Sequence, residues 1–422
     1  MTDVLTDERR CSLGELDPAG SRHNWARSAV TVADDAVFAG GPGGRVTAHR
    51  PDATPIEGWS ATGDTSTHDP AASPGSYVVS LAERDGVLVA GERGPDGYVS
   101  ALSSATGERR WRYATAEDVG TATKESLLFQ PYVVDVAVAG GTTVAAARRY
   151  ERDGEARDWS SAVLGFGPDG DVRWRYRAHA SPIALDVDDG RVAVAYNRCT
   201  EQHVHGLVVL DADSGDPVAN WDPGTEGDRR VGDVAFADDG IAIASHGDKH
   251  GYLLDADGGE RWRVDLASEQ SVDGETVYAY PNHVRVAAGT PVFVTGNTYA
   301  ESTRDPDARH PREHTAVAVD GGDVAWTHDV GGFARGVSAN GSLVAVPSAQ
   351  NFRERTADTH AVHLFDARRG HLDSQSVPGI ASAAALGDDA LAVVEEPVEY
   401  HDEGVTRGAY RLHAWQVDGD AR

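Results

Sequence analysis

Short apolar segments alternate along the whole chain with turns rich in Asp, Gly, Asn and Ser. An alternating segment, such as Ala29 to Val32 or Ala184 to Val187, precedes an Asp/Gly turn and a nearly continuous apolar run such as AVFAG, VLVAG or IAIAS. A variable loop follows, and then a third apolar segment such as LVVLDA or TAVAVD. Short runs of this kind, bounded by turn residues, indicate β-strands connected as hairpins.

The fourth segment of most copies carries a Trp. The stretch DADSGDPVANW, from Asp211 to Trp221, has carboxylates at alternate positions and by itself is similar to a calcium loop. In the other copies the acidic positions change to Ser, Pro or Val, although calcium needs six or more oxygens held together. A hairpin turn is therefore favoured over a metal site. The Trp residues are Trp59, Trp111, Trp174, Trp221, Trp262 and Trp326, and Ser374 stands at the same place in FDARRGHLDS.

Four short antiparallel strands in each repeat of roughly 40 to 60 residues are the plan of a β-propeller blade. We count eight copies, with seven as the alternative if one copy is an irregular insertion. The last copy ends at Tyr410 to Trp415 without a fourth strand, so we expect an N-terminal strand near Trp25 to complete it and close the ring. The predicted organisation is an N-terminal extension (1–22) and a single all-β propeller domain (23–418).

The pattern strand–D-A-x-x-G-x-x-x-W resembles the PQQ-like repeat of quinoprotein dehydrogenase-type propellers, over about residues 25 to 417. The resemblance implies that each Trp docks on the neighbouring blade. Large aromatic side chains bury about 150 to 250 Å² each, so we expect the repeat Trp residues and Trp25 to be structural.

Quinoprotein dehydrogenases of this type use a periplasmic location, a calcium ion, a catalytic Asp and often a disulfide between adjacent cysteines. This chain is shorter, and its only cysteines, Cys11 and Cys199, are far apart. We therefore expect no PQQ or other cofactor, no metal ligands and no catalytic residues. A second branch that the repeat resembles, the scaffold lipoprotein of outer-membrane protein assembly, implies a WD40-like rigid ring that presents loops to protein partners.

The charge balance is strongly acidic. The chain has 67 acidic and 38 basic residues, a net charge of −29, and Lys124 and Lys249 are its only lysines. Dispersed acidic residues with Arg in place of Lys favour a halophilic, archaeal protein over an acidic protein that binds basic partners. Nucleic-acid binding through a general basic surface is disfavoured. No secretory signal, lipid anchor or membrane-spanning segment is evident, which predicts a cytoplasmic protein and, we expect, a monomeric ring.

The scarce cations gather in the long loops between the second and third strands. We expect these loops to lie on one face of the ring and to bind an acidic protein partner or an anionic ligand, because the Arg fork pairs with carboxylate or phosphate. The alternative is that the cations pair with neighbouring carboxylates. The candidate binding residues are Arg148, Arg149, Arg198, His203, His205, His246, His250, Arg312, His314, Arg353 and Arg355.

Two functions remain open. The first is a non-enzymatic scaffold that binds proteins through these Arg/His-rich loops. The second is a metal- or cofactor-dependent enzyme with its site at the mouth of the central channel. The sequence lacks G-x-S-x-G, H-E-x-x-H and a phosphate-binding glycine loop, which favours the scaffold.

Overall fold

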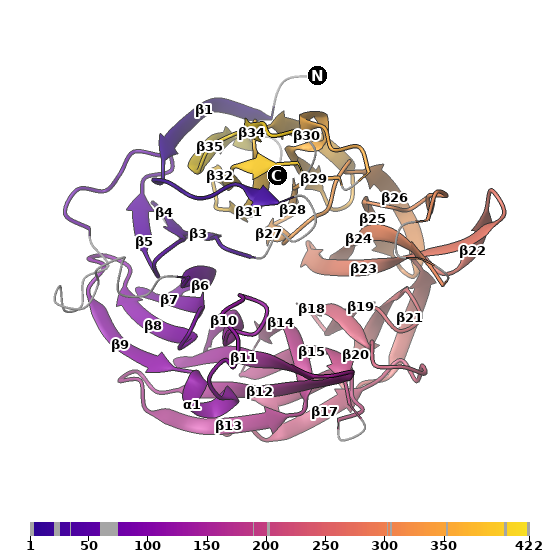
Figure 1. The fold of residues 1–422 in the computed structure, drawn as a ribbon, viewed down its shortest axis with the longest axis horizontal. Helices are drawn as coiled ribbons and strands as arrows, with labels where there is room; N and C mark the ends of the chain where they lie inside the picture. The colour runs from indigo at the N-terminus through magenta and orange to yellow at the C-terminus, as the bar shows by residue number, and fades with distance from the viewer. Residues whose placement is uncertain are drawn as a thin grey trace.

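The computed structural model of the protein describes residues 4–20, 26–33, 35–59, 75–188, 190–200, 203–301, 303, 306–351, 353–400 and 403–419. These residues form a ring of antiparallel sheets around a central channel (Figure 1). The predicted all-β propeller is therefore confirmed. No helix in the described part of the chain is long and apolar enough to cross a membrane.

Successive stretches of the chain form the units of the ring, and within each unit, apart from the short outlying strand β22 (Gln270–Val272), the strands follow one another from the channel to the rim (Figure 1). In chain order the units are β3 (Ala29–Ala33), β4 (Ala36–Gly40) and β5 (Val46–His49); β6 (Tyr77–Arg84), β7 (Val87–Arg93), β8 (Tyr98–Ser103) and β9 (Arg109–Ala114); β10 (Tyr132–Ala139), β11 (Thr142–Asp153), β12 (Ala156–Phe166) and β13 (Val172–Ala178); β14 (Ala180–Asp188), β15 (Arg191–Cys199), β16 (Leu207–Asp211) and β17 (Pro217–Trp221); β18 (Val231–Ala237), β19 (Gly240–Ser245), β20 (His250–Asp255) and β21 (Glu260–Asp265); β22 (Gln270–Val272), β23 (Glu275–Ala287), β24 (Thr290–Ala300), β25 (Thr315–Asp320) and β26 (Asp323–Asp329); β27 (Ser338–Asn340), β28 (Leu343–Ser348), β29 (Ala361–Asp366) and β30 (Gly370–Ser376); and β31 (Ile380–Leu386), β32 (Ala390–Glu396) and β35 (Arg411–Val417) with β1 (Leu5–Ser12).

A few elements stand outside this regular plan. Pairing of Tyr132 with Arg93 joins the sheets β6–β9 and β10–β13 into one. The remaining elements are β2 (Ala19–Gly20), β33 (Val398–Glu399), β34 (Thr406–Arg407), the helix α1 (Ala116–Val119) and a 3-10 turn at Ala357–Thr359. Residues 60–74, after β5, lie outside the described residues, so the count of eight blades stays a prediction.

An N-terminal strand closes the ring, but it is β1 rather than the stretch near Trp25, which lies outside the described residues. β1 pairs antiparallel with β35, from Leu5 opposite Val417 to Ser12 opposite Arg411 (Figure 1). Residues 5–12, assigned to an N-terminal extension by the sequence analysis, thus belong to the last blade. An outermost strand buries little, and in LTDERRCS only Leu5 is fully buried, so the segment lacks the apolar alternation that identified the other strands.

The apolar core lies between neighbouring blades. One cluster, for example, joins Val144 and Trp174 of one blade to Leu185, Val194 and Leu210 of the next. Second strands are covered on both faces, and all six residues of β19 and of β28 are buried. The outermost strands β21 and β26 instead alternate between exposed and partly buried positions. Continuous apolar runs in second strands and alternation in fourth strands follow from this layering.

Trp174 illustrates how the Trp-bearing strands contact the next blade. Its indole N–H donates to the carbonyl oxygen of Ala212 at 2.9 Å, within the next turn of the DADSG type. Gly215 in that turn has φ +74°, and a Cβ there would lie 2.5 Å from the indole ring. Glycine is thus required both for the turn and for the contact.

Other described Trp residues contact the following blade at similar places. The contacts are Trp59 with the carbonyl of Ser104, Trp111 with Phe166, Trp221 with Tyr252, Trp262 with Phe293 and Trp326 with Phe365. How much these contacts contribute to stability stays a prediction.

Candidate ligand site at the mouth of the central channel

The inner strands surround a channel cavity of about 430 Å³. Three aspartates stand on successive inner strands: Asp135 in β10, Asp186 in β14 and Asp233 in β18. One carboxylate oxygen of each accepts the N–H of the following residue at 2.9 to 3.0 Å. The other accepts an N–H from the inner strand of the next blade, from Leu185 at 3.2 Å, Phe236 at 2.7 Å and Val284 at 3.0 Å. These carboxylates therefore link the inner strands to one another.

Arg285, in β23, is the cation that faces this group of carboxylates. Its guanidinium lies 3.0 Å from a carboxylate oxygen of Asp233. Burial raises the pKa of Asp135 to about 6. Burial also opposes ionisation of Asp233, but Arg285 and His283 outweigh it and lower the pKa of Asp233. The part of the channel lined by these three aspartates and Arg285 is thus a hydrogen-bonded charge network in which the acidic oxygens already have donors.

A second cavity, of about 410 Å³, adjoins the channel, and both cavities are lined by Ala26 and Tyr132. We call it the mouth pocket. Its walls carry Arg93, Arg148 and Arg198 from β7, β11 and β15. The guanidinium carbons of Arg93 and Arg148 lie 4.7 and 5.3 Å from the centroid of the Tyr132 ring. Cations from two blades therefore face one aromatic side chain, and Arg198 of a third blade lines the same pocket.

These cations differ in their partners. Arg198 forms an ion pair with Asp228 at 2.7 Å, and Arg93 donates to the carbonyl of Leu127 at 2.8 Å. Arg148 donates to the hydroxyl of Ser181. Within the described ranges, no carboxylate forms an ion pair with Arg148. Burial lowers its pKa, and the charge of Arg198 acts in the same direction.

Arg335 adds a further positive charge where the channel meets the mouth pocket. It lines the channel cavity, and its Nε is buried with no hydrogen-bond partner. In the described part of the chain it forms no ion pair. Burial, with the charge of Arg27, lowers the pKa of Arg335 to about 10 although Glu396 opposes the shift. Burial, with the charges of Arg148 and Arg335, lowers the pKa of Arg93 to about 10 as well.

Burial is the main cause of these lowered pKa values, and the charges of neighbouring cations add to it. A bound anion in the mouth pocket would offset both effects on these cations. The arrangement is therefore suited to binding a carboxylate or a phosphate.

His246 lines the channel below this group. Its Nδ1 lies 2.7 Å from the amide nitrogen of Asn197, which makes Nδ1 the acceptor and places the proton on Nε2. Nε2 is buried and has no hydrogen-bond partner. Burial, with the nearby Arg229, lowers the pKa of His246 to about 3. The imidazole is therefore neutral at physiological pH, and its Nε2–H is enclosed next to Gly232.

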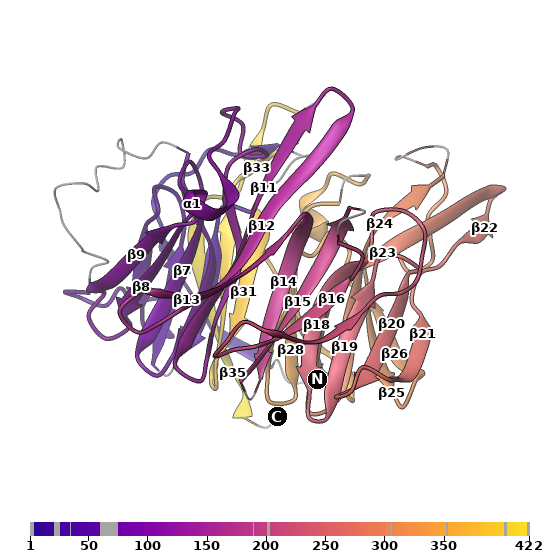
Figure 2. The same ribbon diagram turned by 90° about the horizontal axis from the view of Figure 1, so that it is seen from below.

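The β11–β12 hairpin rises above the mouth pocket. β11 has 12 residues and β12 has 11, and the hairpin projects beyond one face of the ring (Figure 2). Tyr150, Arg157 and Trp159 of this hairpin line the pocket. Tyr150 and Trp159 pack together with ring centroids 5.1 Å apart. The pocket thus has an aromatic wall that extends outward from the guanidinium groups.

Of the binding residues predicted from the sequence, Arg148, Arg198 and His246 come together here. Arg148 and Arg149 are adjacent in β11, and successive side chains of a strand point to opposite faces, so Arg149 turns away. The other predicted residues make internal contacts: Arg149 with Glu151 and the carbonyl of Val119, His203 with Tyr196, His205 with His203, His250 with Asp248, Arg312 with the carbonyl of Leu266, His314 with Asn297, and Arg353 with Glu313. Arg355 follows in the same loop with φ 50°.

Arg93, Tyr132 and Arg335 were not among the residues predicted from the sequence. Arg93 ends β7 and Tyr132 begins β10, so neither lies in the long loops that supplied the predicted residues. A comparison of the residues at the ends of inner and second strands, copy by copy, would have found them.

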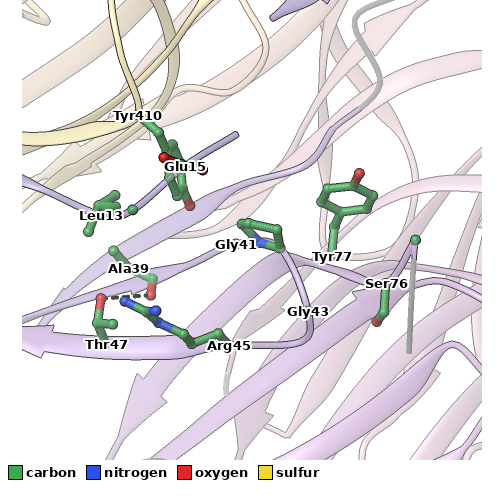
Figure 3. Close-up of a pocket in the computed structure, with 13 residues that line it drawn as sticks. Leu13, Glu15, Ala39, Gly41, Gly43, Arg45, Thr47, Ser76, Tyr77 and Tyr410 are labelled. Carbon is green, nitrogen blue, oxygen red and sulfur yellow. Dashed lines mark hydrogen bonds between the residues drawn. The ribbon is translucent and has the colours of Figure 1, made fainter. Parts of the chain in front are cut away.

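A third cavity, of about 390 Å³, lies between the last and first blades (Figure 3). Leu13, Ala39, Tyr77 and Tyr410 contribute to its walls, and Arg45 is the one basic residue in its lining. It does not gather several charged groups as the mouth pocket does. We therefore take the mouth pocket, with the part of the channel that adjoins it, as the candidate site.

A sequence model of a family described as outer membrane protein assembly factor BamB matches residues 21–193 and 166–372. The chain belongs to this family. The resemblance to the PQQ-like repeat is thus confirmed. No curated protein matches the sequence.

Solved structures extend the likeness to the fold. BamB from Moraxella catarrhalis is 15% identical, covers 98% of this chain and 100% of its own, and has a TM-score of 0.58. Quinohemoprotein alcohol dehydrogenase ADHIIG from Pseudomonas putida HK5 is 12% identical over 97% of this chain and 76% of its own, with a TM-score of 0.57. The WD40 repeats of RRP9 are 11% identical over 94% of this chain and 96% of their own, with a TM-score of 0.51. At these identities the likeness shows the fold alone, and the fold occurs in an assembly factor and in an enzyme.

Proposed function

We propose that this member of the BamB family is a non-enzymatic protein-binding propeller whose mouth pocket receives an acidic segment of its partner. The observation that carries the proposal is the convergence of Arg93, Arg148 and Arg335 near Tyr132, with Arg148 and Arg335 lacking a carboxylate partner in the described residues. The family description, an assembly factor, supports a partner that is a protein.

Buried cations are destabilising unless they are paired or hydrogen-bonded. A carboxylate from a partner would accept from the Arg148 fork, and its negative charge would offset the charge of Arg335, whose Nε is enclosed. Most of the molecule repels acidic chains, because the net charge is −29. The mouth pocket would therefore select the orientation in which an acidic segment approaches, with Tyr150 and Trp159 on the projecting hairpin contacting its flanking residues.

We do not propose a quinone at this site. Quinoprotein sites hold calcium with acidic and amide oxygens, whereas the carboxylates of Asp135, Asp186 and Asp233 each accept two backbone N–H groups and hold the inner strands together. We also retain, as proposals, a monomeric ring in the cytoplasm of a halophile and no role in nucleic-acid binding.

The test is capture of a partner from host lysate in molar salt by the wild-type protein and by the double variant Arg148→Gln/Arg335→Gln. The matched control is Arg84→Gln/Arg263→Gln, which removes the same charge from side chains that are 59% and 62% exposed. We expect the partner to be lost from the first variant and kept by the control. Equal capture by all three proteins would contradict the proposal.

A further inference from the structure

Three histidines meet at the seam between the unit β22–β26 and the unit β27–β30. They are His328 in β26, His363 in β29 and His371 in β30. One ring nitrogen from each lies within 4.8 Å of the other two. None of these residues belongs to the mouth pocket or the channel, so the group has no part in the proposed function.

The sequence of this seam departs from the repeat. The residue two positions after the recurring Trp is Tyr113, Tyr176 or Val264 in other units, and here it is His328. Ser374 occupies the place that Trp takes in most copies. An aromatic and apolar contact between blades has thus been replaced by imidazoles and a hydroxyl.

Hydrogen bonds orient His363 for ligation. Its Nε2 lies 3.1 Å from the carbonyl oxygen of Val330, which accepts only from an N–H, so Nδ1 carries the lone pair. A ligating histidine commonly donates its other N–H to such a carbonyl, which fixes the tautomer.

Ser374 sits between two of the imidazoles. Its Oγ lies 2.8 Å from Nδ1 of His363 and 2.7 Å from Nε2 of His371. The hydroxyl has one proton and two lone pairs. It can therefore bridge the two rings, or a bound ion can take that position between the same nitrogens.

His328 completes the group from the other blade. Its ring stacks on His371 with centroids 4.2 Å apart and an interplanar angle of 2°. Its ring nitrogens make no hydrogen bond within the described residues. Phe365 lies beside His328 with centroids 5.3 Å apart. The one lone pair of neutral His328 is therefore not used by another side chain and is free to bind an ion.

We propose that His328, His363 and His371 bind one divalent transition-metal ion of the zinc, nickel or copper type, with Ser374 or water at the remaining position. Neutral imidazole suits these ions. Zn–N bonds of about 2.0–2.1 Å place ligand nitrogens about 3.4 Å apart in a tetrahedron. The three rings would therefore move together by about 1 Å and rotate so that their lone pairs converge. Such an ion joins two blades across the seam.

The test uses the full chain, stripped with EDTA and held in molar KCl to screen the acidic surface. Zn²⁺ titrated by calorimetry should bind at one ion per chain and raise the melting midpoint. Bound Cu²⁺ should show nitrogen hyperfine splitting in its electron paramagnetic resonance spectrum. Even loss of an outer-shell partner costs about 10–100-fold in metal affinity, so His328→Gln and His371→Gln should each weaken Zn²⁺ binding by about 100-fold or more.

The control variant is His179→Gln, which removes an exposed histidine outside the cluster. It should bind Zn²⁺ as tightly as the wild type. Because His363 is largely enclosed, His363→Gln is judged only if its circular dichroism matches the wild type. One-to-one binding that is unchanged in His328→Gln and His371→Gln, or no binding by the wild type, would overturn the proposal.

Discussion

Replacing Trp174 tests whether the Trp contacts hold the ring together. The indole is 7% exposed and lies in the apolar cluster that joins two blades. Burying about 150–250 Å² of aromatic surface at about 25 cal/mol per Å² is worth about 4–6 kcal/mol as an upper estimate. Measured Trp→Ala changes in cores are about 3–5 kcal/mol. We therefore expect Trp174→Ala to lower the free energy of unfolding by about 4 kcal/mol.

Two comparisons sharpen this prediction. Trp174→Phe keeps most of the ring but loses the 2.9 Å hydrogen bond to Ala212, so it should lower the free energy of unfolding by only about 1–2 kcal/mol. Trp221 is only partly buried, so Trp221→Ala should be milder than Trp174→Ala. Urea unfolding in molar KCl, followed by fluorescence and circular dichroism, measures all three. A change below about 1 kcal/mol for Trp174→Ala, or a larger effect at Trp221, would refute the docking argument.

Three further predictions concern closure, pH and salt. Leu5 is 3% exposed in the closing strand, so Leu5→Asp should release β1, lower the free energy of unfolding by about 3 kcal/mol and leave β35 as an open edge that promotes association; size-exclusion chromatography would show only monomer if this is wrong. The folded-state pKa of Asp135 is raised to about 6, above the unfolded value of about 3.9, so the folded state binds this proton more tightly than the unfolded state. The free energy of unfolding should therefore fall by about 3 kcal/mol as the pH rises from 4 to 6. Unfolding measured across that range should show this pH dependence in the wild type and not in Asp135→Asn. The net charge of −29 should make the fold salt-dependent, with loss of circular dichroism on dialysis to dilute buffer; full retention would argue against a halophilic origin.

The fold was predictable because every blade repeats the same pattern of buried strands and glycine-containing turns. Second strands such as β19 are covered on both faces and therefore appear as continuous apolar runs, and the turn before each Trp needs a glycine such as Gly215. Closure was located wrongly in detail because β1 is an edge strand whose one fully buried side chain, Leu5, gives no periodic signal.

The candidate site was predictable only in part. Arg148 and Arg198 were found because they lie near long loops, but Arg93 and Arg335 end or precede strands, and only closure of the ring brings them together. Arg353 was expected to bind a partner, but its guanidinium Nε forms an ion pair with a carboxylate oxygen of Glu313 at 3.5 Å.

Histidine clusters show the same limit. The histidines predicted as binding residues all lie in the long loops expected from the sequence, whereas the seam joins residues 328, 363 and 371 from the strands of two blades. Distances of this kind depend on strand register between blades, which one sequence does not reveal.

Binding of an acidic segment in the mouth pocket is tested most directly by placing a photocrosslinking residue, p-benzoylphenylalanine, at Tyr150 in the pocket wall. The same residue at Val218, which is 57% exposed on the outer strand β17, is the control. After irradiation in host lysate at molar salt, mass spectrometry identifies the crosslinked peptide. We expect an acidic segment of one partner protein to be crosslinked from position 150 but not from 218, and the crosslink to be lost when Arg148→Gln/Arg335→Gln is introduced. Crosslinks that persist in that variant, or that carry no acidic residues, would contradict the proposal.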